Sequence, residues 1–260
     1  MVFKNSFSLF IAVFLVFSTF KRSILRFALL FVLITSGLSL LSCSEDDNSA
    51  KISGFVLSGN QPIELSTVTL YSTGTERGIE ILGSAQSDSS GFFSISYKSP
   101  SDPDAVLYLT ADSNLISLSQ RIDLSNLNPI RLATVLGQRR VPSEVVINER
   151  TTVATAYTMA QFFTPSGIDG TYPGLQNAAA IAQNLVELSS GGIGHMLDTF
   201  PNGGSTSTRA TLNALANMLV SCVRSEADCD SLFTLATPPG AFTPVNTLRA
   251  ALTPTSPGRM

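Results

Sequence analysis

The sequence has little of what many enzymes and nucleic-acid-binding proteins use. It contains no tryptophan, one histidine and three cysteines in 260 residues, which excludes a chemistry that needs several imidazole groups. Only 13% of the residues are charged, with 16 Lys and Arg against 19 Asp and Glu. Because nucleic-acid binding depends on a dense basic patch, that class of function is set aside.

The first 42 residues differ in character from the rest of the chain. They hold four basic residues and no acidic ones. Phe27–Leu41 is an apolar run of 15 residues that follows KRSILR and ends in small residues, which is the layout of a secretory signal. The run is shorter than the ~20 residues that a membrane-spanning helix needs, so we expect an N-terminal signal helix. A second apolar stretch, Phe7–Phe20, favours a true start codon further along, near Val16.

The end of this leader resembles a known sorting signal. Leu40-Leu41-Ser42-Cys43 is similar to the bacterial lipobox, in which a lipidated cysteine becomes the first residue of the mature protein. The resemblance implies that residues 1–42 are removed and that a lipid on Cys43 attaches the chain to a membrane. Ser44 then favours the outer membrane, facing the periplasm or the cell surface. A membrane-spanning anchor with an incidental Cys43 is the alternative.

The acidic segment 43–50 is too charged to pack, and we interpret it as a flexible tether. If Cys43 is lipidated, Cys222 and Cys229 remain as one pair, and an oxidising compartment favours a disulfide between them. On one continuous helix, seven residues would separate their Cα atoms by ~10 Å, beyond the ~7 Å that a disulfide spans. The helix must therefore end at a turn, for which Ser225–Asp228 is suited. Two unrelated thiols remain the alternative.

Residues 51–137 show a period of two, with short β-rich runs separated by turn residues. Alternation of apolar with small polar residues predicts strands that are buried on one face. The predicted strands are Ile52–Leu57, Ser66–Ser72, Ile79–Ser84, Phe92–Tyr97, Val106–Ala111, Ile116–Ile122 and Ile130–Leu136. The pattern predicts a β-sandwich of about seven strands.

Three motifs in this region resemble a known domain family. Gly54-Phe55-Val56, Val68-Thr69-Leu70-Tyr71 and the hairpin from Ser87 to Ile95 are similar to the carboxypeptidase-regulatory-like, or prealbumin-like, domain. The resemblance implies a prealbumin/Ig-like sandwich. It implies no peptidase activity, because the family is an accessory domain and not the zinc-binding catalytic one.

The hairpin carries the most specific turn signal. Asp88 is placed to cap its own turn with its side chain, and Gly91 accepts the positive φ of a tight reversal. Asp88 with Asp102 and Asp104 is an alternative calcium site, because loop carboxylates suit a hard cation. The EF-hand pattern is missing, however, so we expect no metal and no cofactor.

Beyond the linker Gly137–Pro142 the apolar period changes to about 3.6, which predicts a small all-α C-terminal domain over residues 143–253. Residues 254–260 are expected to be a disordered tail. One predicted helix, Leu175–Leu188, has Ile181 on its apolar side, and another is capped by Ser207 or Thr208. The predicted helices are Glu149–Phe163, Leu175–Leu188, Thr206–Arg224 and a short one that opens at Thr243-Pro244 and runs to Leu252.

This helical region also resembles one found in large secreted bacterial proteins, where it often precedes a propeller of the NHL or streptogramin-lyase type. The similar stretch runs roughly from Val145 to Leu252. No propeller residue is present to compare. The resemblance raises one alternative function, an accessory fragment of a larger lyase-type enzyme that is inactive alone.

The candidates for catalysis are few. His195 with Asp198 and a serine would make a hydrolytic triad, but no G-x-S-x-G element supplies the nucleophile. Glu149 and Glu187 are single carboxylates, whereas a glycosidase needs two that face each other.

We therefore expect a non-enzymatic, lipid-anchored envelope protein whose sandwich acts as a spacer, an adhesion module or a binding module. Its partners would be the membrane, through Cys43, and an envelope protein or polysaccharide. Tyr71, Arg77 and Tyr108, taken as exposed loop residues, are the candidates for contact with a ligand.

Overall fold

The computed structural model describes residues 49–74, 77–113, 130–138 and 141–253. The expected signal segment 1–42, Cys43 and the expected tail 254–260 lie outside these residues, as does the predicted strand Ile116–Ile122. Among the helices of the described ranges, none has both the length and the hydropathy to cross a bilayer.

Within the described residues, eight strands precede helix α2, and six of them match predicted strands. They are β1 (Ser49–Ser58), β2 (Gln61–Pro62), β3 (Thr67–Thr73), β4 (Glu80–Gln86), β5 (Phe92–Lys98), β6 (Val106–Ser113), β7 (Ile130–Gly137) and β8 (Glu144–Ile147). β1 begins at Ser49, so the last two residues of the expected tether 43–50 belong to a strand.

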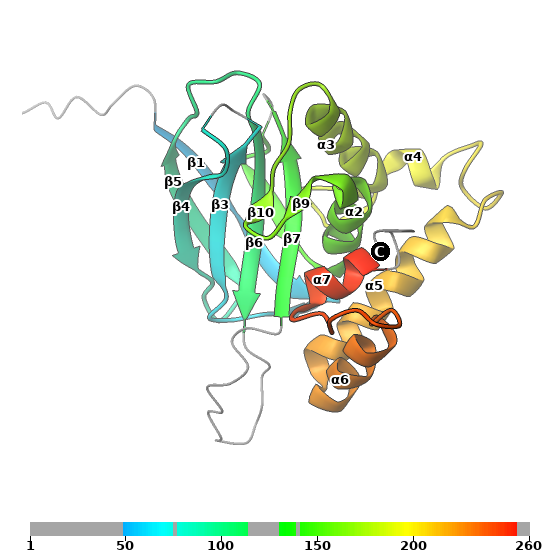
Figure 1. Cartoon of the computed structure of the whole chain (residues 1–260). Helices are drawn as coiled ribbons and strands as arrows, with labels where there is room; N and C mark the ends of the chain where they lie inside the picture. Colours follow the sequence, from blue (N-terminus) through cyan, green and yellow to red (C-terminus); the bar gives the residue numbers. More distant parts are fainter. Residues whose placement is uncertain (1–48, 75–76, 114–129, 139–140, 254–260) are drawn as a thin grey trace, which may run out of the picture. The chain divides into compact units, whose positions relative to one another are not determined.

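The strands form two sheets that pack face to face (Figure 1). One sheet is antiparallel throughout, in the order β4-β3-β6-β7. In the other, β1 pairs with antiparallel β5 along one edge and with β2 and parallel β8 along the opposite edge. Buried side chains from both sheets form a shared core, as alternation of apolar and polar residues predicts. The core includes Ile52, Leu70, Phe93, Leu109 and Leu132.

The strand β8 corrects the prediction that residues 143–253 are helical. Val145, Val146 and Ile147 are buried and β-branched, a composition that favours a strand over a helix. Their pairing with β1 needs a glycine, because a Cβ atom on Gly54 would collide with the carbonyl of Val145. The segment after the linker therefore completes the sheet that contains β1 and β5 before helix α2 begins.

The second half of the chain is mainly helical, with short hairpins between the helices. The elements are α2 (Glu149–Thr158), η2 (Ala160–Phe162), β9 (Phe163–Thr164), β10 (Gly167–Ile168), α3 (Gly174–Leu185), β11 (Val186–Glu187), β12 (Gly192–Ile193), α4 (His195–Asp198), α5 (Thr208–Arg224), α6 (Glu226–Leu235) and α7 (Thr247–Leu252). All of them belong to the same compact unit as the sandwich, Asn48–Met260.

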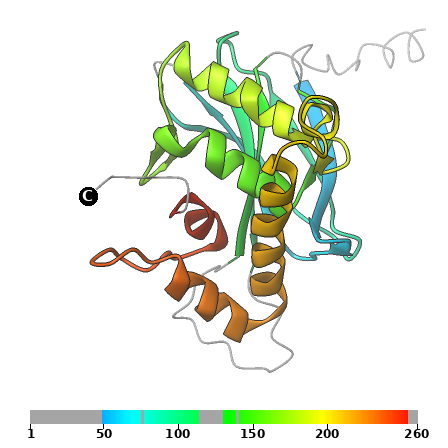
Figure 2. The same cartoon turned by 90° about the vertical axis from the view of Figure 1, so that its right-hand side faces the viewer.

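The helices cover the outer face of the β4-β3-β6-β7 sheet. Figure 2 shows α2 and α3 lying across this side, with α5 running beside α2. Outward-facing residues of β6 and β7, such as Tyr108 and Val135, pack against Met159, Leu175 and the alanines of α3. The molecule therefore has three layers, namely two sheets and one layer of helices.

The free edge of β7 is covered by side-chain hydroxyl groups. The backbone N–H groups of Ala133 and Val135 donate to Thr152 Oγ1 (3.0 Å) and Thr155 Oγ1 (3.2 Å), both on α2. Thr247 of α7 both accepts from the N–H of Arg131 (3.0 Å) and donates to its carbonyl (2.7 Å). An open sheet edge would expose unpaired backbone groups, and here threonines pair them.

Several helix details differ from the predictions. α3 ends at Leu185 and not at Leu188, and Ile181, expected on its buried side, is 49% exposed. Ser207 precedes α5 without a side-chain cap. α7 opens at Asn246, whose side chain accepts from the N–H of Arg249, and not at Thr243.

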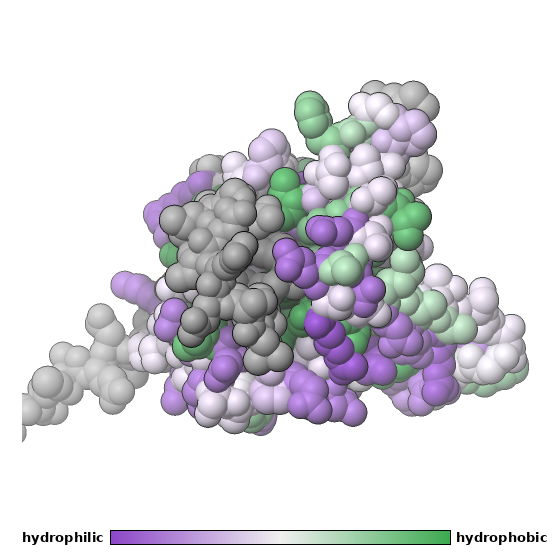
Figure 3. All heavy atoms as spheres, turned by 90° about the horizontal axis from the view of Figure 1, so that it is seen from below, coloured by the Kyte–Doolittle hydropathy of each residue, from purple (hydrophilic) through white to green (hydrophobic). Residues whose placement is uncertain are grey.

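The side of the molecule seen from below presents no broad apolar surface in its described part. Figure 3 shows hydrophobic residues there in small groups among hydrophilic ones. Isolated exposed apolar residues are ordinary on protein surfaces and need no partner to explain them.

Candidate functional site

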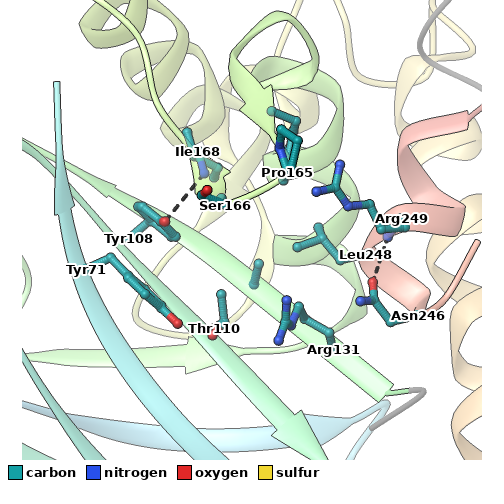
Figure 4. Close-up of a pocket in the computed structure, with 13 residues that line it drawn as sticks. Tyr71, Tyr108, Thr110, Arg131, Pro165, Ser166, Ile168, Asn246, Leu248 and Arg249 are labelled. Atoms are coloured by element: carbon teal, nitrogen blue, oxygen red, sulfur yellow. Dashed lines mark hydrogen bonds between the residues drawn. The ribbon is translucent and has the colours of Figure 1, made fainter. Parts of the chain in front are cut away.

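A pocket opens on the outer face of the β4-β3-β6-β7 sheet, between β3, β6 and β7, the β9–β10 hairpin and α7 (Figure 4). Its space, including the part open to solvent, is about 470 Å³. Figure 4 shows tyrosines at one side and arginines at the other. The described residues that line it include aromatic, hydroxyl, amide and guanidinium groups, but no carboxylate.

Two tyrosines form the aromatic side of the pocket. Tyr71 of β3 and Tyr108 of β6 are direct cross-strand partners, so the sheet register brings their rings together. The rings stack with centroids 4.8 Å apart and planes at 10°. Tyr108 is only 2% exposed, whereas Tyr71 is partly exposed and is the more accessible of the two rings.

The β9–β10 hairpin fixes the hydroxyl of Tyr108, which accepts a hydrogen bond from the N–H of Ile168 (3.4 Å). Gly167 has a φ of 145°, and a Cβ atom there would lie 2.7 Å from the Tyr108 hydroxyl oxygen. Glycine thus permits the close approach. Burial raises the pKa of Tyr108 to about 12.

Arg131 reaches the pocket from β7. Its Nε donates to Asp112 Oδ1 of the neighbouring strand β6 at 2.5 Å. Burial lowers the pKa of Arg131, but the hydrogen bond and the negative charge of Asp112 outweigh this effect, so the pKa is raised overall. The ion pair holds the guanidinium in place beside the sheet.

Arg249 reaches the pocket from α7, whose first turn Asn246 caps. Its guanidinium donates to the carbonyl of Thr164 at 2.7 Å and lies 5.6 Å from the ring centre of Phe163. Burial, and then the positive charge of Arg131, lower the pKa of Arg249 from its ordinary value. Both cations line the same pocket.

The groups in this pocket suit binding better than proton transfer. Arginine stays protonated at neutral pH, and Tyr108, with a pKa of about 12, stays neutral. Hydroxyl and amide groups of Thr110, Ser166 and Asn246 add hydrogen-bonding capacity without a titration near pH 7. The arrangement can hold a ligand by stacking, hydrogen bonds and charge.

Of the three residues predicted to contact a ligand, two lie in this pocket and the third does not. Tyr71 and Tyr108 share the pocket, but they lie on strands and not on loops, and Tyr108 is buried. Arg77 is exposed and borders a different depression, between Ser72 and Lys98. The sequence analysis missed Arg131 and Arg249, and no local motif could have found them, because they lie 118 positions apart and meet only after α7 docks on β7.

The expected hairpin at Asp88 is a turn between β4 and β5, which lie in different sheets and do not pair with each other, and its side chains hold the turn itself. Asp88 Oδ1 accepts from the N–H of Ser90 (2.8 Å), the hydroxyl of Ser90 (2.6 Å) and the N–H of Phe92 (3.0 Å). The hydrogen bonds from Ser90 are the main reason that the pKa of Asp88 is lowered. Gly91 has a φ of 77°, and a Cβ atom there would lie 2.5 Å from the carbonyl oxygen of Val56.

The carboxylates considered for calcium have separate roles. Asp88 is occupied by its own turn, while Asp102 accepts from the N–H of Asp104 (2.8 Å) in another turn. No cluster of three or more His, Cys, Asp or Glu side chains with the spacing of a metal site occurs among the described residues.

Cys222 and Cys229 form a disulfide in the structure, with their Cα atoms 3.9 Å apart. α5 ends at Arg224 and α6 begins at Glu226, so the two cysteines lie on different helices. Ser225 makes the turn between them, where its hydroxyl accepts from the N–H of Asp228. The break in the helix that the spacing requires is therefore present.

The residues considered for catalysis do not come together. His195 is exposed at the start of α4, and Asp198 forms an ion pair with Arg209. Glu187 is exposed on β11, where it accepts from the hydroxyl of Ser189. Glu149, in contrast, is buried at the first turn of α2, and its Oε2 accepts from the N–H of Gly59 at 3.0 Å.

Comparison with known proteins adds little. No protein-family model matches the chain, and no curated protein is significantly similar to it. A crystal structure of a 9R-lipoxygenase from Cyanothece PCC8801 aligns with 16% sequence identity and a TM-score of 0.24. The alignment covers 38% of this chain and 16% of that chain, and at this similarity it supports no inference about fold or function.

Proposed function

We propose that this chain is a lipid-anchored, non-catalytic protein of the bacterial cell envelope that binds carbohydrate in the pocket on its outer sheet face. The proposal includes the signal helix, lipidation at Cys43 and a prealbumin-like sandwich. The pocket is the observation that carries it, because a partly exposed tyrosine faces hydrogen-bonding side chains on a rigid sheet. Sugar rings offer C–H faces for stacking on aromatic rings and hydroxyl groups for polar contacts.

The position of the first strand determines how far from the membrane an anchor at Cys43 would hold the sandwich. β1 begins at Ser49, six residues after Cys43. Even fully extended, six residues reach only about 20 Å. A lipid on Cys43 would therefore keep the sandwich close to the membrane surface, where envelope polysaccharides are found.

The anchor is tested by expressing the full chain in a Gram-negative host beside a Cys43→Ala variant. Intact mass and detergent-phase partitioning are then measured for both. We expect the unaltered chain to start at a lipidated Cys43 and to enter the detergent phase, and the variant to lack the lipid. A product that keeps residues 1–42 without lipid would contradict the anchor.

Carbohydrate binding is tested by affinity electrophoresis of the full chain in detergent against a set of neutral and acidic polysaccharides. We expect retardation by at least one of them, and a loss of about tenfold in affinity for Tyr71→Ala, since stacking on an aromatic ring contributes on the order of 1 kcal/mol or more. Tyr157→Ala is the matched control, because Tyr157 is 61% exposed on α2 and does not line the pocket. Equal mobility with every polysaccharide would contradict the function.

A further inference from the structure

Two guanidinium groups line the pocket, and the carboxylate of Asp112, outside the lining, pairs with one of them. Arg131 is paired with Asp112, whereas the contacts of Arg249 are a carbonyl oxygen and an aromatic ring, both without formal charge. Arg249 is also partly buried, and it lines the same pocket as Arg131. The described part of the pocket therefore carries one positive charge in excess, which a bound anion would neutralise.

Both arginines keep hydrogen-bond donors that an anion with two oxygen atoms can use. A guanidinium has five N–H donors, and the hydrogen bonds of the described residues use Nε of Arg131 and one terminal nitrogen of Arg249. Both side chains thus keep donors for a ligand. Guanidinium groups match carboxylates in shape and often bind them through two parallel hydrogen bonds.

The rest of the pocket fits a sugar ring attached to that carboxylate. Tyr71 presents an aromatic surface from β3, on the side of the pocket opposite Arg249 (Figure 4). Thr110, Ser166 and Asn246 lie between or beside these groups and carry hydroxyl and amide groups. A simple inorganic anion would use the arginines and leave this aromatic and polar lining without a role.

We propose that the pocket binds an acidic saccharide of the uronate class, with the carboxylate held by Arg131 and Arg249 and the sugar ring against Tyr71. This inference rests on the proposed carbohydrate-binding function and specifies its ligand. The site recognises the carboxylate by charge and shape, so a neutral sugar of the same size binds more weakly.

The experiment is calorimetric titration of the full chain in detergent with tri-galacturonate and with its methyl ester, which has the same rings without charge. We expect the acid to bind and the ester to bind about tenfold or more weakly, because a charge-assisted hydrogen-bond pair is worth roughly this factor. Arg249→Gln is expected to remove this preference. Arg209→Gln is the control, since Arg209 is an exposed arginine in an ion pair away from the pocket.

A second measurement does not depend on the folding of any variant. The affinity of the unaltered chain for tri-galacturonate should fall as salt is raised from 20 to 200 mM, while affinity for the ester should not, because salt screens charges in a partly exposed site. Sodium phosphate serves as the third probe. Phosphate that binds as tightly as tri-galacturonate would overturn the saccharide part of the inference.

The possible failures can be told apart. Equal affinity for acid and ester, unaffected by Arg249→Gln, would overturn the uronate inference and leave the carbohydrate-binding function standing. Absence of binding to both compounds would overturn the inference too, and the polysaccharide set described above then decides whether the proposed function fails with it.

Discussion

The two faces of the β4-β3-β6-β7 sheet are both buried, but by different kinds of contact. The face toward β1 and β5 is covered by apolar side chains such as Leu70, Leu109 and Leu132. On the outer face and along β7, alanines and threonines of α2, α3 and α7 provide much of the cover. Apolar side chains therefore pack at both interfaces, and hydrogen bonds to hydroxyl groups along the edge of β7 distinguish the second.

The comparison explains the unusual sequence of α2, ERTTVATAYT. Threonine is a poor helix former, and this helix has no strong apolar side. Thr151, Thr152 and Thr155 are nevertheless buried, because their hydroxyl groups bond to the backbone of β7. A helix that covers a sheet edge needs such side chains more than it needs leucine.

The largest loss of stability is expected for a substitution in the core between the two sheets. Leu109 is completely buried among apolar side chains of both sheets. We expect Leu109→Ala to lower the free energy of unfolding by about 2–5 kcal/mol, through lost burial and the cavity left behind. Urea unfolding of the full chain, followed by circular dichroism, measures this change. Ile181→Ala is the control, since Ile181 is 49% exposed on α3 and should change little.

The same experiment tests whether the two kinds of interface unfold together. Because α2 is hydrogen-bonded to β7, helical and β signals should be lost in one transition. A helical signal that survives after the β signal is lost would show that the helices do not depend on the sheet, and the comparison would fail.

The second largest loss of stability is expected when the disulfide between α5 and α6 in the helical layer is removed. Cys222 and Cys229 join α5 to α6 across a separation of seven residues, and both are buried. Replacing both by serine should cost about 2–3 kcal/mol, mainly because the unfolded chain regains the freedom of a short loop. Thermal unfolding of the full chain with and without a reducing agent checks this. A reductant that lowers the melting temperature of the serine variant as strongly as that of the unaltered chain would contradict the assignment.

The third largest loss of stability is expected when one hydrogen bond along β7 is removed without changing the shape of the side chain. Thr152→Val keeps the shape of the side chain but leaves the N–H of Ala133 without its acceptor. A buried donor without a partner costs about 1–3 kcal/mol, so we expect a loss of that size in urea unfolding. Thr152→Ser keeps the hydroxyl group and should lose less. If valine is tolerated as well as serine, packing and not hydrogen bonding holds α2 against the edge.

The sequence was sufficient for the parts of the fold that have a strong period. Six strands follow from alternation, and the buried side of α5 follows from apolar residues spaced three and four apart, such as Leu212, Ala216, Leu219 and Val223. β8 was not predicted, although its β-branched residues favour a strand, because four residues without alternation do not stand out from the helix predicted directly after them. Its pairing depends on Gly54, which lies 91 positions before its partner Val145, and no local pattern reveals this.

Only the tyrosines of the candidate site could be predicted from the sequence. The arginines could not, because they come together through contacts between residues far apart in the chain. Tyr71 and Tyr108 stand out in sequence as aromatic residues of the predicted strands. Arg131 and Arg249 do not stand out, because their role arises from the docking of α7 on β7 through Thr247. Glu149, a single carboxylate without a visible mate in the sequence, finds its partner in the backbone of the β1–β2 turn.

A substitution at Glu149 is expected to give the smallest change in stability, and to raise the free energy of unfolding where the other substitutions lower it. Its carboxylate is buried, with Oε2 bonded to the N–H of Gly59 and Oε1 without a hydrogen-bond partner among the described residues. Burial raises the pKa of Glu149, although the hydroxyl of Ser58, the N–H of Gly59 and the charge of Arg224 oppose this. The folded state thus holds the proton more tightly than the unfolded state does.

A raised carboxyl pKa makes stability fall as pH rises. Below the unfolded pKa, near 4.5, Glu149 is protonated in both states and its contribution is fully present. Between the unfolded and the folded pKa the native state binds more protons, so the contribution is lost as pH rises through the folded pKa. Glu149→Gln keeps an acceptor for Gly59 and has no charge to bury.

We therefore expect Glu149→Gln to be more stable than the unaltered chain at pH 7, by about the worth of one hydrogen bond, ~1 kcal/mol, and equally stable at pH 4. Urea unfolding at both pH values measures the difference. Glu187→Gln is the control, because Glu187 is exposed on β11 and should not alter the pH dependence. A loss of stability at pH 7 in Glu149→Gln would mean that the charge of Arg224 outweighs burial. The contact between α2 and the β1–β2 turn would then be an ion pair, and the outer layer would depend on charge as well as on the hydroxyl groups along β7.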